Sequence, residues 1–413
     1  MKNLFKNNYF KNSIWLYILN FFQIVIPLLT FPFITRVLGS EEYGYFNIAL
    51  NLVSYMQILI EYGFNYTGTR IIAMSKKEEY QKIYSSIIAC KFFLLVVCIG
   101  IIALITAFTN YDRKVIMGLH IMLVMLIGIA MQQTWFFQGI QEMKFISIIN
   151  IVARTISVAL VFLLIKSPEN LYLYCLLYSL TYLISGLFSV LICRFKFSLK
   201  LRFESIKEII KAFKNGFSIF LTTAMTKVIS SFGALLIGIY VSGSEVGIYY
   251  AIQKIPSVLI LMFNPISQVM FPYFSNRFKE NSRDATKKLR KIMFIVMPII
   301  ICLAILIILV SKALISILCG EEYIKGVIYL YALIPWTVFS ILNNFLGVQN
   351  LVARGREKEY SKLFSIYCIV SIVANLYFVI NFACIGASLC LLVTEVMFSL
   401  ILIVYDKFRI RNE

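Results

Sequence analysis

The chain has 413 residues, of which 60% are hydrophobic and 14% are charged, and its formal net charge is +19. Soluble domains carry about 25% charged and about 45–50% apolar residues, so this composition excludes an ordinary soluble protein. The apolar residues form repeated runs of about twenty residues, the length that a helix needs to cross a hydrocarbon core of about 30 Å. Backbone groups in hydrocarbon must satisfy their own hydrogen bonds, so these runs predict an all-α integral membrane protein.

Twelve transmembrane helices are predicted along the chain. The first six are expected at residues 13–35, 43–62, 83–108, 115–138, 145–165 and 171–193. The other six are expected at residues 215–241, 246–271, 292–312, 327–350, 361–381 and 384–404. Lys2, Lys6 and Lys11 precede the first span, which is too long for a removable signal, so we expect it to remain.

Most Lys and Arg residues fall in the termini and in the even-numbered connections, above all in residues 194–215 and 277–291. Excess Lys and Arg mark the cytoplasmic side of a membrane, which predicts that both the N- and C-termini are cytoplasmic. The positive charge therefore indicates topology and attraction to anionic membrane lipid, and no nucleic acid partner is expected. A docking site for a protein partner is the alternative.

Residues 194–214 carry an amphipathic pattern. Apolar side chains follow helical spacing at Phe203, Ile206, Ile209, Ile210 and Phe213. Cationic side chains that point elsewhere are Lys207, Lys211 and Lys214. The pattern predicts a cytoplasmic helix at the membrane interface, linking an N-terminal six-helix lobe (1–193) to a C-terminal six-helix lobe (215–413).

A short connector occurs twice. "LGSEEYGYFNIA" (38–49) follows the first span, and "SGSEVGIYYAI" (242–252) follows the seventh. A weaker pair is "GIQEMKF" (139–145) and "GREKEY" (355–360), after spans four and ten. The shared order and sidedness predict two parallel repeats, a transporter plan in which the substrate site lies in a central cavity between the halves.

The combined motifs resemble a known family. "FPFITRVLGSEEYGYFNIA" (31–49), "YGFNYTGTRIIA" (62–73), "TWFFQGIQEMKFISIINIVAR" (134–154) and "GIYYAIQKIPSVLILMFNPISQVMFPYFS" (247–275) carry the resemblance. They are similar to the O-antigen flippase family of the multidrug/oligosaccharidyl-lipid/polysaccharide exporter superfamily. The resemblance covers essentially the whole chain and implies twelve helices in two lobes around a central cationic cavity.

The resemblance also implies a function. Members translocate an undecaprenyl-diphosphate-linked oligosaccharide from the cytoplasmic to the outer leaflet of the bacterial inner (plasma) membrane, for O antigen or capsule biosynthesis. A polysaccharide polymerase and chain-length machinery are the protein partners to expect. The oligosaccharide already exists, so no bond need be made or broken, and a transporter by alternating access is expected rather than an enzyme.

Sugar hydroxyls cost a few kcal/mol each when they enter hydrocarbon unpaired, so a polar cleft must replace their water. No cofactor is expected beyond coupling to an H⁺ or Na⁺ gradient. The nine cysteines show no metal-ligand spacing, so no metal site is expected.

Cations inside spans are the candidate substrate ligands, because an ionisable residue there costs roughly 2.5–3.5 kcal/mol on insertion scales. Arg154 in the fifth span and Lys227 in the seventh are the first choice for diphosphate contacts, with a buried ion pair as the alternative. Lys91 and Lys254 are further candidates, although a side chain reaching for the interface explains them nearly as well. Arg36 either binds substrate or caps the first span.

Two carboxylates and three polar side chains complete the candidate site. Glu61 and Glu395 either carry a coupling proton or counter a nearby cation. Gln132 and Gln138 are candidates for contacts with sugar hydroxyls, and Trp135 for stacking on a sugar ring. The alternative for Trp135 is an ordinary interfacial anchor.

Rival functions fit the sequence less well. A polysaccharide polymerase or glycosyltransferase usually needs a sizeable outside loop, whereas the longest outside connection here surrounds "LCGEEYIKG" (318–326). A cation-coupled drug or metabolite exporter of the same superfamily is the nearer rival. The four intramembrane cations favour an anionic, lipid-linked substrate over the smaller apolar molecules that such an exporter would carry.

Overall fold

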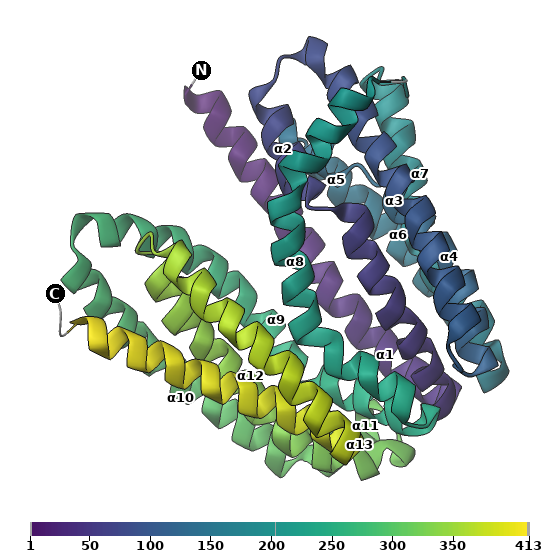
Figure 1. Cartoon of the computed structure of the whole chain (residues 1–413), viewed down its shortest axis with the longest axis vertical. Helices are drawn as coiled ribbons and strands as arrows, with labels where there is room; N and C mark the ends of the chain where they lie inside the picture. Colours follow the sequence, from purple (N-terminus) through teal and green to yellow (C-terminus); the bar gives the residue numbers. More distant parts are fainter. Residues whose placement is uncertain (1, 203, 411–413) are drawn as a thin grey trace. The chain divides into compact units, whose positions relative to one another are not determined.

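The computed structural model describes residues 2–202 and 204–410, and within these ranges the chain is helical without a β-strand (Figure 1). The chain divides into two compact units, unit 1 up to Lys227 and unit 2 from Val228 onward. Each unit contains several long apolar helices, which makes the protein a multi-pass membrane protein.

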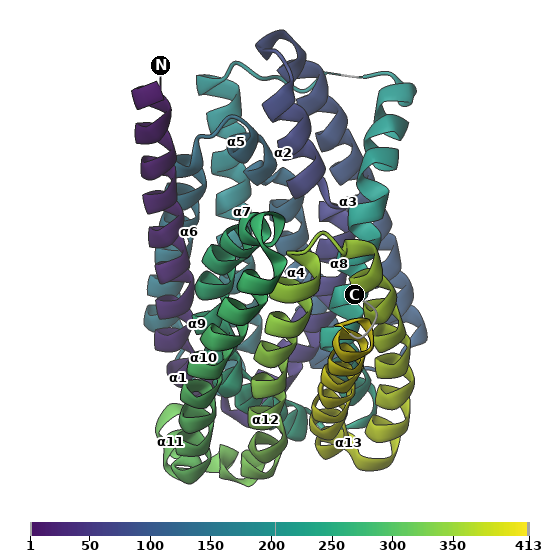
Figure 2. The same ribbon diagram turned by 90° about the vertical axis from the view of Figure 1, so that its left-hand side faces the viewer.

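Unit 1 is a bundle in which α4 packs against α7 and α1, and α6 packs against the same two helices (Figure 2). Its helices are α1 (Lys2–Glu61), α2 (Phe64–Met74), α3 (Tyr80–Phe108), α4 (Arg113–Met131), α5 (Thr134–Gly139), α6 (Met143–Leu164), α7 (Leu171–Lys196) and the first part of α8 (Ile206–Tyr240). Short 3₁₀ turns lie at Lys77–Glu79 and Pro168–Asn170.

The α4–α7 contact depends on two glycines that face each other. A Cβ atom on Gly128 would overlap the backbone of Tyr182 and Leu183, and one on Gly186 would overlap the carbonyl oxygen of Gly128. Lipid tails are as apolar as the side chains, so helices in a membrane associate mainly through such close backbone packing.

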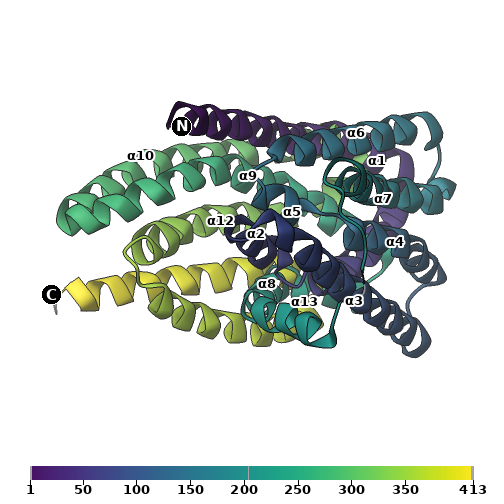
Figure 3. The ribbon, with the colours of Figure 1, turned by 90° about the horizontal axis from the view of Figure 1, so that it is seen from above.

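Unit 2 is built around α12, which packs against α13, α9 and α10 (Figure 3). Its helices are the rest of α8, α9 (Gly243–Glu280), α10 (Ser282–Leu309), α11 (Ser311–Leu318), α12 (Val327–Asn343), the π-helix η4 (Asn344–Val352) and α13 (Glu357–Ile410). A 3₁₀ segment, Glu321–Gly326, precedes α12.

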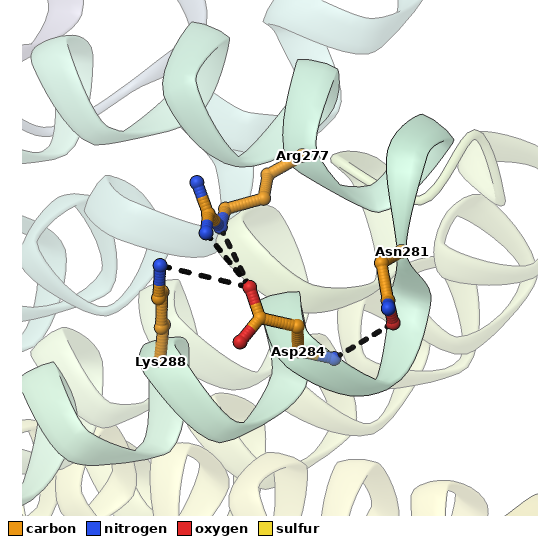
Figure 4. Close-up of polar contacts among 4 residues, drawn as sticks. All are labelled: Arg277, Asn281, Asp284 and Lys288. Carbon is orange, nitrogen blue, oxygen red and sulfur yellow. Dashed lines mark hydrogen bonds and ion pairs between the residues drawn. The ribbon is translucent and has the colours of Figure 1, made fainter.

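An ionic cluster fixes the turn between α9 and α10 (Figure 4). The Arg277 guanidinium donates two hydrogen bonds to Asp284 Oδ2, at 3.0 and 2.8 Å, and Lys288 Nζ lies 3.6 Å from the same oxygen. Asn281 Oδ1 accepts the backbone N–H of Asp284 at 3.0 Å, which caps the start of α10. One carboxylate therefore ties the end of α9 to the first turn of α10.

Nine segments of the described chain are long and apolar enough to cross a membrane, or ten if the two parts of α8 form one span. The longest, Ile18–Met74 with 57 residues, would extend ~85 Å as one straight helix, far beyond a hydrocarbon core of about 30 Å. Gly39, at φ 75°, interrupts this segment, and Ala383, at φ 50°, interrupts α13 in the same way. The prediction of twelve helices with cytoplasmic termini stays a prediction.

The segment predicted as a linker helix is divided between two long helices. Residues 194–196 end α7, and residues 206–214 form the first turns of α8, while Phe203 lies outside the described residues. The Phe213 ring lies 5.1 Å from that of Tyr62 and 6.0 Å from that of Phe93, so this end of the apolar face packs within unit 1. Ile206 and Ile210, on the same predicted face, are exposed. Lys82 of α3 and Glu208 of α8 form an ion pair at 3.0 Å across the same contact.

Substitution of Gly128 by Val should destabilise unit 1, because the new side chain would force α4 and α7 apart. Overpacking of this kind typically costs about 1–3 kcal/mol. The measurement is thermal unfolding of the purified protein in detergent. Gly100→Val is the matched control, since a Cβ atom at Gly100 meets nothing within 4 Å. Equal melting temperatures for the two variants would contradict the proposed role of the glycine contact.

Candidate functional site

The second half of α1 presents the first group of polar side chains in unit 1. Gln57 Nε2 donates a hydrogen bond of 2.9 Å to Glu61 Oε1, and both side chains are half-buried. Residues 57 and 61 are one helical turn apart, so they share a face of α1. The predicted carboxylate at Glu61 is thus held in place by its own helix.

Lys227, a predicted phosphate ligand, lies beside the same stretch of α1. Its ammonium is 5.5 Å from the centre of the Tyr55 ring, the distance of a cation–π contact. The Tyr55 hydroxyl is buried and, within the part of the chain that the structure describes, has no hydrogen-bond partner. Tyr55 was not among the residues predicted from sequence. The only signal there is a hydroxyl-bearing ring inside an apolar span.

Arg154 in α6 is the second predicted phosphate ligand. It is half-buried and makes no hydrogen bond or ion pair with any residue described in the structure. The Tyr182 hydroxyl lies within electrostatic range of both Arg154 and Glu61. Three helices of unit 1, namely α1, α6 and α7, therefore bring a carboxylate, a guanidinium and a phenol to one neighbourhood.

Tyrosines extend this neighbourhood along α7. Tyr174, Tyr178 and Tyr182 recur every four residues, with ring centres 6.4 and 5.9 Å apart. This spacing places all three rings on one face of the helix. The Phe46 ring packs 4.5 Å from Tyr174 and closes one end of the row. A row of phenols offers hydroxyl groups and flat apolar faces, the two features that sugar recognition requires.

Lys91 lies in the core of unit 1, where its side chain is only 3% exposed. Its ammonium donates hydrogen bonds of 2.8 Å to the carbonyl oxygens of Ile129 and Gln132, at the end of α4. A cation is favourable there because the last carbonyls of a helix lack partners and carry partial negative charge. Lys91 also lies within electrostatic range of Glu61. In this structure Lys91 caps a helix, and its predicted contact with substrate stays a prediction.

The predicted sugar-contact residues lie at the α4–α5 break. Trp135 is completely buried, with its ring beside Gly68 and 6.4 Å from the Tyr84 ring, which leaves no face open for a sugar in this structure. Gln138 Oε1 accepts a hydrogen bond of 3.2 Å from Thr69 Oγ1, and Gln132 is half-buried. The remaining predicted cations, Arg36 in α1 and Lys254 in α9, are exposed on the surfaces of their units.

Glu395 of α13 is the centre of a second polar group, in unit 2. Its carboxylate accepts a hydrogen bond from Asn343 Nδ2, and Trp336, Ser340 and Tyr367 lie within hydrogen-bonding reach of it. No Lys or Arg forms an ion pair with Glu395 among the described residues. All the neighbours that contact the carboxylate are neutral, so the alternative of a counter-charge for a nearby cation has no support here.

A buried network of amides and hydroxyls lies on the neighbouring turn of η4. Gln349 is completely buried, and its Nε2 atom donates to the backbone oxygen and Oγ of Ser267, at 3.0 and 2.9 Å. Ser267 Oγ donates in turn to Asn344 Oδ1 at 2.9 Å. Isolated π-helical turns occur frequently at functional sites. These residues were missed from sequence, although the run "NNFLGVQN" (343–350) within an apolar span was a usable signal.

Comparison with known proteins places the chain in a family. A family model described as "Polysaccharide biosynthesis protein" matches residues 9–278. A "Putative O-antigen transporter" of Escherichia coli (strain K12) is 24% identical over 96% of both chains. A protein of the same name from Shigella dysenteriae is 27% identical over 95% of this chain and 98% of its own.

The fold is also shared with a solved structure. The lipid II flippase MurJ, in an inward closed conformation, superposes with a TM-score of 0.70 over 96% of this chain and 87% of MurJ, at 16% identity. At this identity the likeness establishes the fold alone. The family match covers more than half of the sequence and confirms the resemblance carried by residues 31–49 and 134–154. The chain therefore belongs to the family of polysaccharide biosynthesis proteins.

Proposed function

We propose that the protein is a flippase for an undecaprenyl-diphosphate-linked oligosaccharide. It moves this molecule from the cytoplasmic to the outer leaflet of a bacterial inner membrane by alternating access and catalyses no bond-making step. The name of the two bacterial relatives, "Putative O-antigen transporter", and the fold shared with the lipid II flippase MurJ support this proposal. The sugar portion would then be extended by a polymerase on the outer side.

One observation carries the proposal. Arg154 lies in a membrane-spanning helix with its guanidinium free of any hydrogen bond or ion pair to the described residues. The Glu61 carboxylate lies in the same neighbourhood but forms no ion pair with Arg154 among the described residues. A cation in a span costs roughly 2.5–3.5 kcal/mol on insertion scales, so direct contact with an anion is favourable. A diphosphate supplies that partner, because guanidinium groups bind phosphate oxygens through paired, charge-assisted hydrogen bonds.

The surroundings of Arg154 suit the other parts of the substrate. Lys227, which lies over the Tyr55 ring of α1 in the same unit, is proposed to add a second positive charge for the diphosphate. The phenols of Tyr178 and Tyr182 offer hydroxyls and ring faces to the first sugars. A drug or metabolite exporter of the same fold would need no such pairing of cations with phenols, which makes it the less favoured function.

We further propose twelve membrane crossings with both termini in the cytoplasm. The breaks at Gly39 and Ala383 divide two helices that are each too long for one crossing. The basic residues of the α9–α10 turn then lie on the cytoplasmic side, in accord with the positive-inside rule.

We propose that Glu395 carries the proton that couples transport to the proton gradient. Its contacts include N–H donors of Asn343 and Trp336, whereas a sodium ion requires oxygen ligands. The carboxylate is surrounded by neutral groups, so a gained or lost proton changes the local charge without an opposing cation to cancel it.

Replacement of Arg154 or Lys227 by Ala should reduce export of surface polysaccharide roughly ten-fold or more, since each charge-assisted hydrogen bond contributes about 1.5–3 kcal/mol. The measurement is complementation of a strain that lacks its own flippase, with variants compared at matched membrane levels. Arg154→Lys should retain part of the activity because it keeps the charge but loses the paired geometry.

Arg113→Ala, which removes an exposed Arg at the start of α4, is the control and should complement fully. If the wild type complements and both Ala variants are fully active, the flippase assignment would stand. Arg154 and Lys227 would then not form its substrate site. Failure of the wild type in its native host would remove the flippase assignment itself.

Glu395→Gln should abolish the response of transport to an imposed proton gradient while leaving substrate exchange without a gradient largely intact. The amide keeps the shape of the side chain but cannot carry a proton. The measurement uses proteoliposomes that contain a labelled lipid-linked oligosaccharide. Movement of the labelled headgroup across the membrane is followed with and without a pH difference. Glu357→Gln, at the exposed start of α13, is the matched control. A sodium-dependent wild type, or a gradient response that survives in Glu395→Gln, would contradict the role given to Glu395.

A further inference from the structure

A cavity of about 410 Å³ lies within unit 2, away from the Glu395 group. It is bounded by three elements, α10, η4 and the last turns of α13, and none of these belongs to the phosphate site of unit 1. The lining residues are Thr286, Leu289, Arg290, Met293, Phe294, Phe345, Leu346, Asn350, Ile403, Asp406 and Lys407. Its volume falls in the range of small-molecule and lipid sites.

The cavity is divided into an apolar part and a charged part. Leu289 and Phe345 are buried in its wall, whereas Phe294 is 71% exposed. At the charged end, Arg290 and Lys407 are exposed on α10 and α13. Apolar side chains beside two cations can bind an anion that also carries an apolar chain.

The charged end has a net positive charge. Asp406 Oδ2 lies 3.7 Å from the Arg290 guanidinium, and its Oδ1 accepts a hydrogen bond of 3.1 Å from Asn350 Nδ2. Asp406 therefore orients Arg290 and offsets one of the two cations, and Lys407 supplies the surplus. An anion that enters must lie on the side of Arg290 and Lys407 away from this carboxylate.

The neighbouring part of unit 2 adds to the positive electrostatic potential at the charged end of the cavity. Arg354 donates a hydrogen bond of 2.8 Å to Thr286 Oγ1, a lining residue, and its guanidinium lies 4.7 Å from the Phe278 ring centre. Lys287 and Lys291 are close to Arg290 in sequence but do not line the cavity. The basic turn between α9 and α10 continues directly into this helix (Figure 4).

We propose that this cavity binds an anionic phospholipid from the membrane leaflet that contacts the α9–α10 turn. Arg290 and Lys407 bind the headgroup phosphate, and an acyl chain lies along Met293, Phe294 and Ile403. Basic pockets between membrane helices on the cytoplasmic side bind anionic lipid headgroups in this manner. The inference requires a membrane protein but does not depend on which substrate the protein transports.

Such a lipid would connect the start of α10 to the end of α13. A ligand that binds only the folded state stabilises it, and the stabilisation grows with the logarithm of ligand concentration above the Kd. Phosphatidylglycerol should therefore raise the melting temperature of the protein in neutral detergent, whereas phosphatidylcholine should not.

The test uses the full-length protein and measures phosphatidylglycerol binding by native mass spectrometry and by thermal stabilisation. The double variant Arg290→Gln/Lys407→Gln should bind phosphatidylglycerol on the order of ten-fold more weakly, because two basic contacts are lost. The matched control Lys287→Gln/Lys291→Gln removes the same charge from α10 outside the cavity and should change binding by less than about two-fold. Phe294→Ala should also weaken the binding of phosphatidylglycerol, because the acyl chain loses its contact with this ring.

Three outcomes would overturn the proposal. Equal weakening in both double variants would show diffuse surface attraction instead of a site. Displacement of phosphatidylglycerol by inorganic phosphate at equal concentration would show an anion site that ignores the lipid chain. Stronger binding of undecaprenyl phosphate than of phosphatidylglycerol, with the same dependence on Arg290 and Lys407, would assign the cavity to the transported lipid. None of these readouts involves polysaccharide export, so they remain separate from a failure of the proposed function.

Discussion

The contact between Lys91 and the end of α4 is the interaction on which unit 1 depends. α4 ends at Met131, within a stretch predicted to be one continuous span, and its last carbonyl groups therefore end inside the protein. The Lys91 ammonium binds two of them, at 2.8 Å each. The Ile129 carbonyl also accepts the backbone N–H of Gln132 at 3.3 Å, so Lys91 matters most for the Gln132 carbonyl. Loss of a buried donor of this kind costs about 1–3 kcal/mol. α5 begins after this break and buries Trp135, and one buried cation binds carbonyl groups at the discontinuity.

The two units solve the problem of buried polar groups in different ways. Unit 1 places cations beside aromatic rings, as in the contact of Lys227 with Tyr55, where the ring stabilises a charge that it does not itself neutralise. Unit 2 surrounds the carboxylate of Glu395 with amide, indole and hydroxyl groups. The first arrangement keeps a positive charge beside a neutral ring, and the second keeps a carboxylate among neutral groups. In the proposed function, substrate binding is therefore assigned to unit 1 and proton coupling to unit 2.

The sequence alone predicted the helical class and a connector between residues 35 and 43, where Gly39 interrupts α1, because apolar length and turn residues are local properties. It also identified Arg154 and Lys227 as cations inside spans. It did not predict which face of a helix is buried, since that depends on residues far away in the chain. Trp135 is the clearest case. An indole ring suits stacking on a sugar, yet this ring is completely buried beside Gly68 and its faces are closed. The Gln349 network was missed for the same reason, because amides in a span reveal their partners only after folding.

The two proposed phosphate sites differ in how deeply their cations are buried. Arg290 and Lys407 are exposed, so salt at physiological strength screens their attraction beyond about 8 Å, and only direct contact with a lipid headgroup distinguishes them from other surface cations. Arg154 is half-buried in a span, where screening is weaker and the cost of an unpaired charge is larger. An exposed cation can therefore exchange lipids at little cost, whereas a cation inside a span favours an anion that contacts it directly. The two proposed sites would then differ in selectivity, with the exposed pair open to membrane phospholipid and Arg154 restricted to the diphosphate of the proposed substrate.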